Sequence, residues 1–201
     1  MSTPVDVPHV PRRDGTYSRS FGRVLLRLLG WRISGELPDH PRLVMIVAPH
    51  TSNWDFFIGL ATRFALDLEV TWLGKHTLFL GPWAPLLRQL GGVPVNRKAP
   101  RGLLPELIRR LNSRQRFLVA LAPEGTRRKV ARWKSGFHVI ARQTEALIVP
   151  VALDYGRKEV RFGPPLQPSA DIEADMGLLR AFYAGVTPRH PENYERSFER
   201  I

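Results

Sequence analysis

Apolar and polar positions follow one another along the chain in a pattern that predicts strands and helices in turn. Short apolar runs, typical of buried strands, lie at residues 43–47, 68–73, 92–95, 117–121 and 146–153. Stretches with apolar residues at helical spacing lie between these runs, at residues 54–64, 83–90, 103–111 and 135–143. Because such alternation favours parallel pairing, we expect an α/β domain with a mostly parallel central sheet flanked by helices. An edge strand at residues 158–162 and a last helix at residues 176–184 would complete it.

The two ends of the chain differ from this domain, which we place at residues 35–187. Residues 1–18 are rich in Pro, Arg and Ser and predict a disordered lead-in, and the polar residues 188–201 predict a loosely attached tail. Residues 19–34 predict an amphipathic helix. Its apolar face consists of Phe21, Val24, Leu25, Leu28 and Leu29, and a separate basic row consists of Arg19, Arg23 and Arg27. This pattern is typical of a helix that lies in a membrane surface. A helix packed on its own domain with solvated arginines fits it equally well.

The charge balance changes the picture, because 30 Lys and Arg residues against 18 Asp and Glu residues give a formal net charge of +12. Such an excess points to an anionic partner: nucleic acid, a phospholipid surface or a phosphorylated substrate. The chain has no Cys, which excludes disulfides, a thiolate nucleophile and Cys-ligated metals. No apolar run approaches the roughly 18–20 residues of a membrane-crossing helix, and the N-terminus has no secretory signal. We therefore expect a cytoplasmic protein.

The motif PHTSNWD, directly after the first predicted strand, carries a candidate catalytic pair. On a continuous helix His50 and Asp55 would point about 140° apart. We therefore expect His50 on the loop, Ser52 as the N-cap and Asp55 in the first helical turn, folded back toward the imidazole. An aspartate bound to one ring nitrogen leaves the other nitrogen free to act as a base. The alternative is a capping box, in which Asp55 only caps its own helix.

Two further motifs follow predicted strands and carry groups suited to phosphate. GGVPVNRK puts Arg97 at the carboxyl end of a strand, where α/β sheets bind ligands. Its guanidinium can hold phosphate through two charge-assisted hydrogen bonds, although a solvated basic loop also fits. APEGTR combines a tight turn with the Thr126 hydroxyl and the Arg127 guanidinium, which makes it a candidate phosphate cradle. Glu124 in this turn could bind the backbone amides of a neighbouring turn.

A fourth segment, IVPV, contains Pro150, which interrupts a predicted strand and is expected at a sheet edge or a bulge. In this order, the four segments resemble the glycerolipid acyltransferases typified by lysophosphatidate acyltransferase. The four motifs of that family match, in turn, His50-x4-Asp55 and residues 92–97, 123–127 and 149–151. The resemblance runs from about Leu43 to about Pro165. The chain departs from many members in having Pro49 before the histidine and in having only the basic amphipathic stretch as an N-terminal apolar segment.

The resemblance implies transfer of a fatty acyl group from acyl-CoA or acyl carrier protein to the hydroxyl of a lysophospholipid-type acceptor such as 1-acylglycerol-3-phosphate. His50 would be the general base and Asp55 would orient it, without an acyl-enzyme, a metal or a further cofactor. The acceptor-binding residues implied by position are Arg97, Glu124, Gly125, Thr126, Arg127 and Lys75. With the basic helix, the resemblance implies a peripheral protein on the anionic inner face of the cell membrane.

Three other hypotheses remain open on the sequence. The same chemistry could act on another acceptor, such as a lyso-aminolipid, a glycolipid or another alcohol. A nucleic-acid-binding protein would use the basic cluster Arg127, Arg128, Lys129, Arg132 and Lys134, but this cluster has no interleaved aromatic residue besides Trp133 and no accompanying nucleic-acid motif. A lipid-binding relative without activity is the third, and the intact His50 and Asp55 argue against it.

Overall fold

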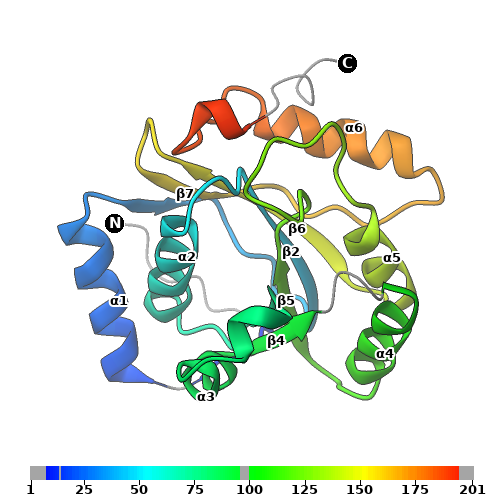
Figure 1. Ribbon diagram of the computed structural model, residues 1–201, viewed down its shortest axis with the longest axis horizontal. Helices are drawn as coiled ribbons and strands as arrows, with labels where there is room; N and C mark the ends of the chain where they lie inside the picture. Colours follow the sequence, from blue (N-terminus) through cyan, green and yellow to red (C-terminus); the bar gives the residue numbers. More distant parts are fainter. Residues whose placement is uncertain (1–7, 14, 96–99, 195–201) are drawn as a thin grey trace.

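The computed structural model describes residues 8–13, 15–95 and 100–194, and in these residues a seven-stranded sheet forms the centre of the molecule (Figure 1). Its strands lie in the order β1 (Arg32–Ser34), β7 (Glu159–Phe162), β6 (Leu147–Asp154), β2 (Arg42–Ala48), β5 (Phe117–Leu121), β3 (Thr71–Lys75) and β4 (Gly92–Val95). All neighbouring pairs are parallel except β6 and β7. The expected α/β fold with a mostly parallel sheet is confirmed.

Helices cover both faces of this sheet (Figure 1). One face carries α1 (Thr16–Leu28) and α2 (Trp54–Ala65), and the other carries α4 (Pro100–Asn112), α5 (Gly136–Gln143) and α6 (Ile172–Tyr183). The short helices are η1 (His76–Phe79), α3 (Ala84–Gln89) and η2 (Pro191–Asn193). Successive side chains of β2 point to opposite faces, so Leu43 packs in the core under α1 and α2 and Val44 in the core under α4 to α6. Strands buried on both faces explain the unbroken apolar runs of the sequence.

The register of the central strands brings three of the motifs to one edge of the sheet. Ile46 of β2 lies opposite Leu121 of β5 and opposite Pro150 of β6. Because these strands are parallel, the loops that follow them leave the sheet at the same edge. The residues after β2 and after β5 are therefore neighbours, although more than 70 positions separate them in the sequence. We call this edge the carboxyl edge.

Pro150 lies inside β6, an inner strand, and the sheet-edge alternative is wrong for it. A proline cannot donate to the ladder, and a tyrosine hydroxyl from α6 supplies hydrogen bonds beside it. Tyr183 Oη accepts the Val151 N–H at 3.0 Å and donates to the Ile46 carbonyl at 2.6 Å. Tyr183 thereby ties β6 to β2 where the ladder is interrupted.

The predicted amphipathic helix at 19–34 is wrong at both ends. The structure has a helix from Thr16 to Leu28, after which Gly30 adopts a positive φ of 73° and ends it. Arg32–Ser34 then pairs with β7, so the strand at 159–162 is not the sheet edge.

The lead-in prediction is wrong for the described part of residues 8–18. Val10 is 2% exposed and belongs to the core under α1 and α2. Arg12 forms a β-bridge with Leu68, and Thr16 begins α1. This segment is attached by the burial of Val10 and by backbone hydrogen bonds to the loop between α2 and β3.

The prediction of a loosely attached tail is wrong for residues 188–194. Tyr194 is 4% exposed, and the His190 N–H donates to Thr51 Oγ1 at 3.2 Å. The last helix also begins earlier than expected, at Ile172, because Asp171 caps it by accepting two backbone N–H groups of its first turn.

Candidate active site

The candidate catalytic pair lies at the carboxyl edge, where His50 is on the loop after β2 and Asp55 is in the first turn of α2. The distance between His50 Nδ1 and Asp55 Oδ2 is 3.1 Å, which confirms that the loop folds the carboxylate back to the imidazole. The side chain of Asp55 is 1% exposed and that of His50 is 28% exposed. The helix differs from the expectation in its cap, since Asn53 precedes it and Ser52 Oγ accepts the Trp54 N–H at 3.2 Å.

Asp55 accepts hydrogen bonds on both carboxylate oxygens. Oδ2 accepts the N–H groups of Thr51 and Ser52, both at 2.8 Å, in addition to its contact with His50. Oδ1 accepts the hydroxyl of Tyr155 at 2.7 Å. The bond to the Ser52 N–H is the arm expected of a capping box, so the capping and pairing interpretations hold together. With these donors, the carboxylate has a single orientation from which to hold the imidazole.

This geometry distinguishes the two nitrogens of the imidazole, because Nδ1 faces Asp55 at 3.1 Å. In the tautomer of His50 that has its proton on Nδ1, Nε2 carries the lone pair that can accept a proton. The partly exposed ring can be reached by a substrate hydroxyl, whereas the buried Asp55 cannot. An imidazole placed in this way can act as a general base, with the aspartate favouring one tautomer.

Glu124, in the turn after β5, connects the third motif to the first. Its Oε1 accepts the His50 N–H at 3.0 Å, which confirms the expectation that it ties down a neighbouring turn. Glu124 is 4% exposed, and its Oε2 is buried without a hydrogen-bond partner among the residues that the structure describes. Burial raises its pKa to about 7, and the hydrogen bond from His50 opposes this only in part.

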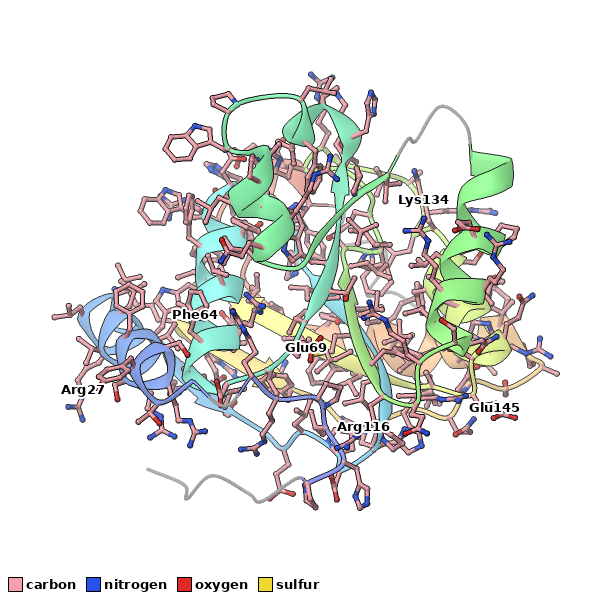
Figure 2. All side chains as sticks on the ribbon, turned by 90° about the horizontal axis from the view of Figure 1, so that it is seen from below. Arg27, Phe64, Glu69, Arg116, Lys134 and Glu145 are labelled. Carbon is pink, nitrogen blue, oxygen red and sulfur yellow. The ribbon has the colours of Figure 1, made fainter. Side chains whose placement is uncertain are left out.

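The rest of the PEGTR turn is shaped by Gly125 and closed by Lys134. Gly125 has a φ of 65°, and a Cβ there would lie 3.1 Å from Lys134 Cε, so a side chain would be strained and crowded. The Lys134 N–H donates to the Pro123 carbonyl at 2.9 Å, and Lys134 lies toward the carboxyl edge in Figure 2. Thr126 Oγ1 accepts the Arg128 N–H at 3.3 Å. Arg127 itself is exposed to solvent.

The sequence of this chain matches a known protein family over most of the sheet. The family model described as Acyltransferase matches residues 33–154, more than half of the chain. The chain belongs to the acyltransferase family. Such an enzyme transfers acyl groups. No curated protein matches the sequence.

A solved structure shares the fold of this acyltransferase. The crystal structure of PlsC, the 1-acyl-sn-glycerophosphate (LPA) acyltransferase from Thermotoga maritima, superposes with a TM-score of 0.54 at 22% sequence identity. The match covers 78% of this chain and 71% of that chain. Among the described residues of the acyltransferase, none of the helices has the length and apolar character that a membrane span needs.

Lys75, an expected acceptor residue of the acyltransferase, is separated from His50 by a strand. Lys75 is the exposed last residue of β3 and reaches the carboxyl edge, but β5 lies between β3 and β2. Arg97 lies outside the described residues. The strand that precedes it ends at Val95, opposite Lys75.

The structure adds site residues that the motifs did not indicate. Tyr155 follows β6, the neighbour of β2, and its hydroxyl reaches Asp55. Burial, and then the hydrogen bond to Asp55, raises the pKa of Tyr155 and keeps its hydroxyl a donor. The Arg189 guanidinium carbon lies 5.3 Å from the ring centroid of Trp54 and 5.7 Å from that of Tyr155. The position of Tyr155 after the fourth motif was a usable signal, because the carboxyl ends of neighbouring parallel strands meet. For Arg189, which lies in the polar segment near the end of the chain, the sequence contained no such signal.

A cavity of about 210 Å³ lies beside these added residues. Most of its wall residues are apolar or aromatic: Leu29, Trp31, Trp54, Ile58 and Tyr155. Two cationic residues, Lys158 and Arg189, complete the wall. The cavity thus joins the end of α1 and the start of α2 to the residue that holds Asp55.

Proposed function

We propose that this acyltransferase moves a fatty acyl group from an acyl thioester, acyl-CoA or acyl carrier protein, to the hydroxyl of a lysophospholipid-type acceptor such as 1-acylglycerol-3-phosphate. The observation that carries the proposal is the buried Asp55 at 3.1 Å from His50 Nδ1, which leaves Nε2 of a partly exposed ring as a base. The family supports the reaction class. The acceptor class rests on the shared fold of PlsC and on the basic groups at the carboxyl edge.

The proposed reaction has one addition and one elimination. Nε2 of His50 takes the proton of the acceptor hydroxyl as its oxygen bonds to the thioester carbonyl carbon. The tetrahedral intermediate then expels the thiolate as the C–S bond breaks, and the imidazolium returns the proton to the sulfur. Asp55 stabilises the imidazolium formed between these steps. The products are the ester and the free thiol, and no group stays on the enzyme.

Glu124 and the turn that follows it support the acceptor side of the site. Glu124 accepts the His50 N–H from the turn after β5, and this bond attaches the loop of the base to the PEGTR turn. Arg127 is the exposed guanidinium of this turn, and we assign it to the acceptor phosphate, with Gly125 and Thr126 shaping the turn beneath it. Lys75 and Arg97 are the remaining cations assigned to this head group by the family motifs.

An acceptor panel tests this function directly. The purified protein is incubated with acyl-CoA or acyl carrier protein thioester and with lysophosphatidate, a lyso-aminolipid or an uncharged long-chain alcohol, and ester products are identified by mass spectrometry. We expect a product with lysophosphatidate, and Arg127→Ala should raise the KM for this acceptor while the donor KM changes little. Arg142→Ala, an exposed arginine on α5, is the control. Ester formation only with uncharged alcohols would contradict the proposed acceptor.

We place this reaction at an anionic membrane surface through α1. One side of α1 packs on α2, where Gly22 is so close that a Cβ would lie 2.4 Å from a backbone nitrogen. Another side carries a row of exposed apolar residues at helical spacing. Their exposed fractions are 93% for Tyr17, 59% for Phe21, 56% for Val24 and 78% for Leu28. Both hypotheses for this helix therefore have support, since a packed helix still offers an apolar face with basic neighbours.

Vesicle binding separates the basic and apolar contributions of α1. Arg23→Glu with Arg27→Glu should release the protein from anionic vesicles, because each basic residue near such a surface contributes about 1 kcal/mol. Phe21→Ser with Leu28→Ser should weaken binding at any lipid charge. Arg19 is left unchanged, because it pairs with the buried Asp67 at 2.9 Å. Activity on a soluble short-chain acceptor should survive in both variants.

The control for this experiment reverses two arginines on the other face of the sheet, Arg109→Glu with Arg142→Glu, which are on α4 and α5. Equal release by the control pair would show a general charge effect and contradict the role of α1.

A further inference from the structure

A second and larger cavity lies at the amino ends of the strands, whereas His50 lies at the carboxyl edge. Its volume is about 550 Å³, and it lies at the start of β3 and of β4, where its walls include Thr71 and Gly92. His50 follows the carboxyl end of β2. Strand β2 is parallel to β5, and β5 is parallel to β3, so the start of β3 and the end of β2 lie at opposite ends of the sheet. In Figure 2 Glu69, which lines this cavity, and Lys134, which closes the PEGTR turn, lie toward opposite ends of the strands. The cavity is therefore separate from the proposed active site.

Four segments distant in the sequence bring arginines to this cavity. Its arginines come from the N-terminal segment, α2, α3 and the turn after α4: Arg12 and Arg13, Arg63, Arg88 and Arg114. Among the described residues that line it, Glu69 is the one acid. Like charges that converge in this way repel one another, and an anion between them removes the repulsion. We call this site the basic cavity.

Arg63 gives the basic cavity a cation that is itself buried. It is 6% exposed, and Nε and Nη1 are buried without a hydrogen-bond partner among the described residues. Burial, and then the charge of Arg13, lowers the pKa of Arg63 to about 10, against the opposing effect of Glu69. Its guanidinium carbon lies 5.6 Å from the ring centroid of Phe64, a contact that does not neutralise the charge. A buried guanidinium that stays charged is costly without an anion.

We propose that the basic cavity binds a phosphate-bearing ligand with two or more negative charges. Planar guanidinium groups from several directions match the oxygens of a phosphate, each with two hydrogen bonds. The walls carry Thr71, Gln89 and exposed arginines and few apolar side chains, which suits a polar anion better than an acyl chain. Such a phosphate exists on soluble metabolites and on anionic lipid head groups, and both present the same chemistry to the cavity.

Calorimetric titration with inorganic pyrophosphate at constant ionic strength tests this site without any enzyme assay. We expect saturable binding with one ligand per chain. Arg88→Ser with Arg114→Ser, both exposed, should raise the Kd at least tenfold. Arg109→Ser with Arg142→Ser removes the same charge outside the basic cavity and should change the Kd less than twofold. Arg63→Lys keeps the charge but loses the planar fork, and should raise the Kd several-fold with an unchanged circular dichroism spectrum.

Vesicles of phosphatidylcholine with phosphatidate identify the source of the phosphate. If the Arg88 and Arg114 double variant loses vesicle binding and pyrophosphate displaces the wild type from vesicles, the ligand is a lipid head group. If the double variant binds vesicles normally but has lost pyrophosphate affinity, the ligand is soluble. Either result supports the site. No pyrophosphate binding, or equal weakening by both double variants, would overturn it, and neither result bears on acyl transfer.

Discussion

Replacing Glu124 by glutamine should make the free energy of unfolding less sensitive to pH. Burial raises the pKa of Glu124 from 4.5 to about 7, and the hydrogen bond from the His50 N–H opposes this only in part. As the pH rises, glutamate in the unfolded chain ionises first, because its pKa is lower. Between the two pKa values the unfolded state binds fewer protons than the folded state, so the wild type loses stability as the pH rises.

The magnitude follows from the two pKa values. A difference between 4.5 and about 7 corresponds to about 3 kcal/mol once Glu124 is ionised in both states. Glutamine keeps an oxygen that can accept the His50 N–H, but it has no proton to lose. The free energy of unfolding of Glu124→Gln should therefore rise relative to the wild type by about 2–3 kcal/mol between pH 5 and pH 8.

Urea unfolding, followed by circular dichroism at pH 5, 6, 7 and 8, measures this difference. Glu36→Gln, which changes an exposed glutamate, is the matched control and should follow the wild type at every pH. Parallel pH dependences for Glu124→Gln and the wild type would refute the reasoning from burial.

Two further variants test hydrogen bonds to buried carboxylates. Tyr155→Phe removes the 2.7 Å bond to Asp55, and kcat should fall about tenfold with an unchanged acceptor KM in steady-state kinetics, whereas a purely structural role would lower only the melting temperature. Asp175→Asn breaks a buried pair, since Asp175 Oδ2 lies 2.8 Å from His138 Nε2. Burial acts to raise the pKa of Asp175, but its hydrogen bonds outweigh this and leave it lowered. The variant should cost about 3 kcal/mol at pH 7, and the loss should shrink below about pH 4, in urea titrations.

The sequence predicted those parts of the site that local geometry and strand order determine. The spacing of His50 and Asp55 around a helix start leaves few ways to arrange them, and the carboxylate folds back as expected. The bond from the His50 N–H to Glu124 could be predicted because both residues follow parallel strands that are neighbours.

The remaining contacts depend on packing that no local pattern contains. Arg189 reaches the site because residues 188–194 fold across the carboxyl edge, and polar residues near a chain end carry no signal of this. Val10 lies in a segment rich in Pro, Arg and Ser that shows no strand or helix pattern, yet its burial helps to attach that segment. The end of α1 was misplaced because the helical spacing of apolar residues continues past Leu28, whereas Gly30 turns the chain into β1.

The basic cavity could not be located from the sequence. The charge excess indicated an anionic partner without locating its site, and the structure gathers Arg63, Arg88 and Arg114 at the amino ends of β3 and β4. The arginines of the basic cavity come from four segments of the chain, so no single motif could indicate it. Only the folded arrangement brings them together.

The central claim is that His50 is the general base, and the acyl transfer rate of His50→Ala tests it most directly. The chain offers a matched control in His9, whose Nδ1 lies 2.7 Å from Asp39 in an exposed pair that resembles the buried one. With acyl-CoA and lysophosphatidate, release of free thiol should fall about 10²–10⁴-fold in His50→Ala and stay unchanged in His9→Ala, with similar melting temperatures for both. A rate for folded His50→Ala near that of the wild type would contradict the account.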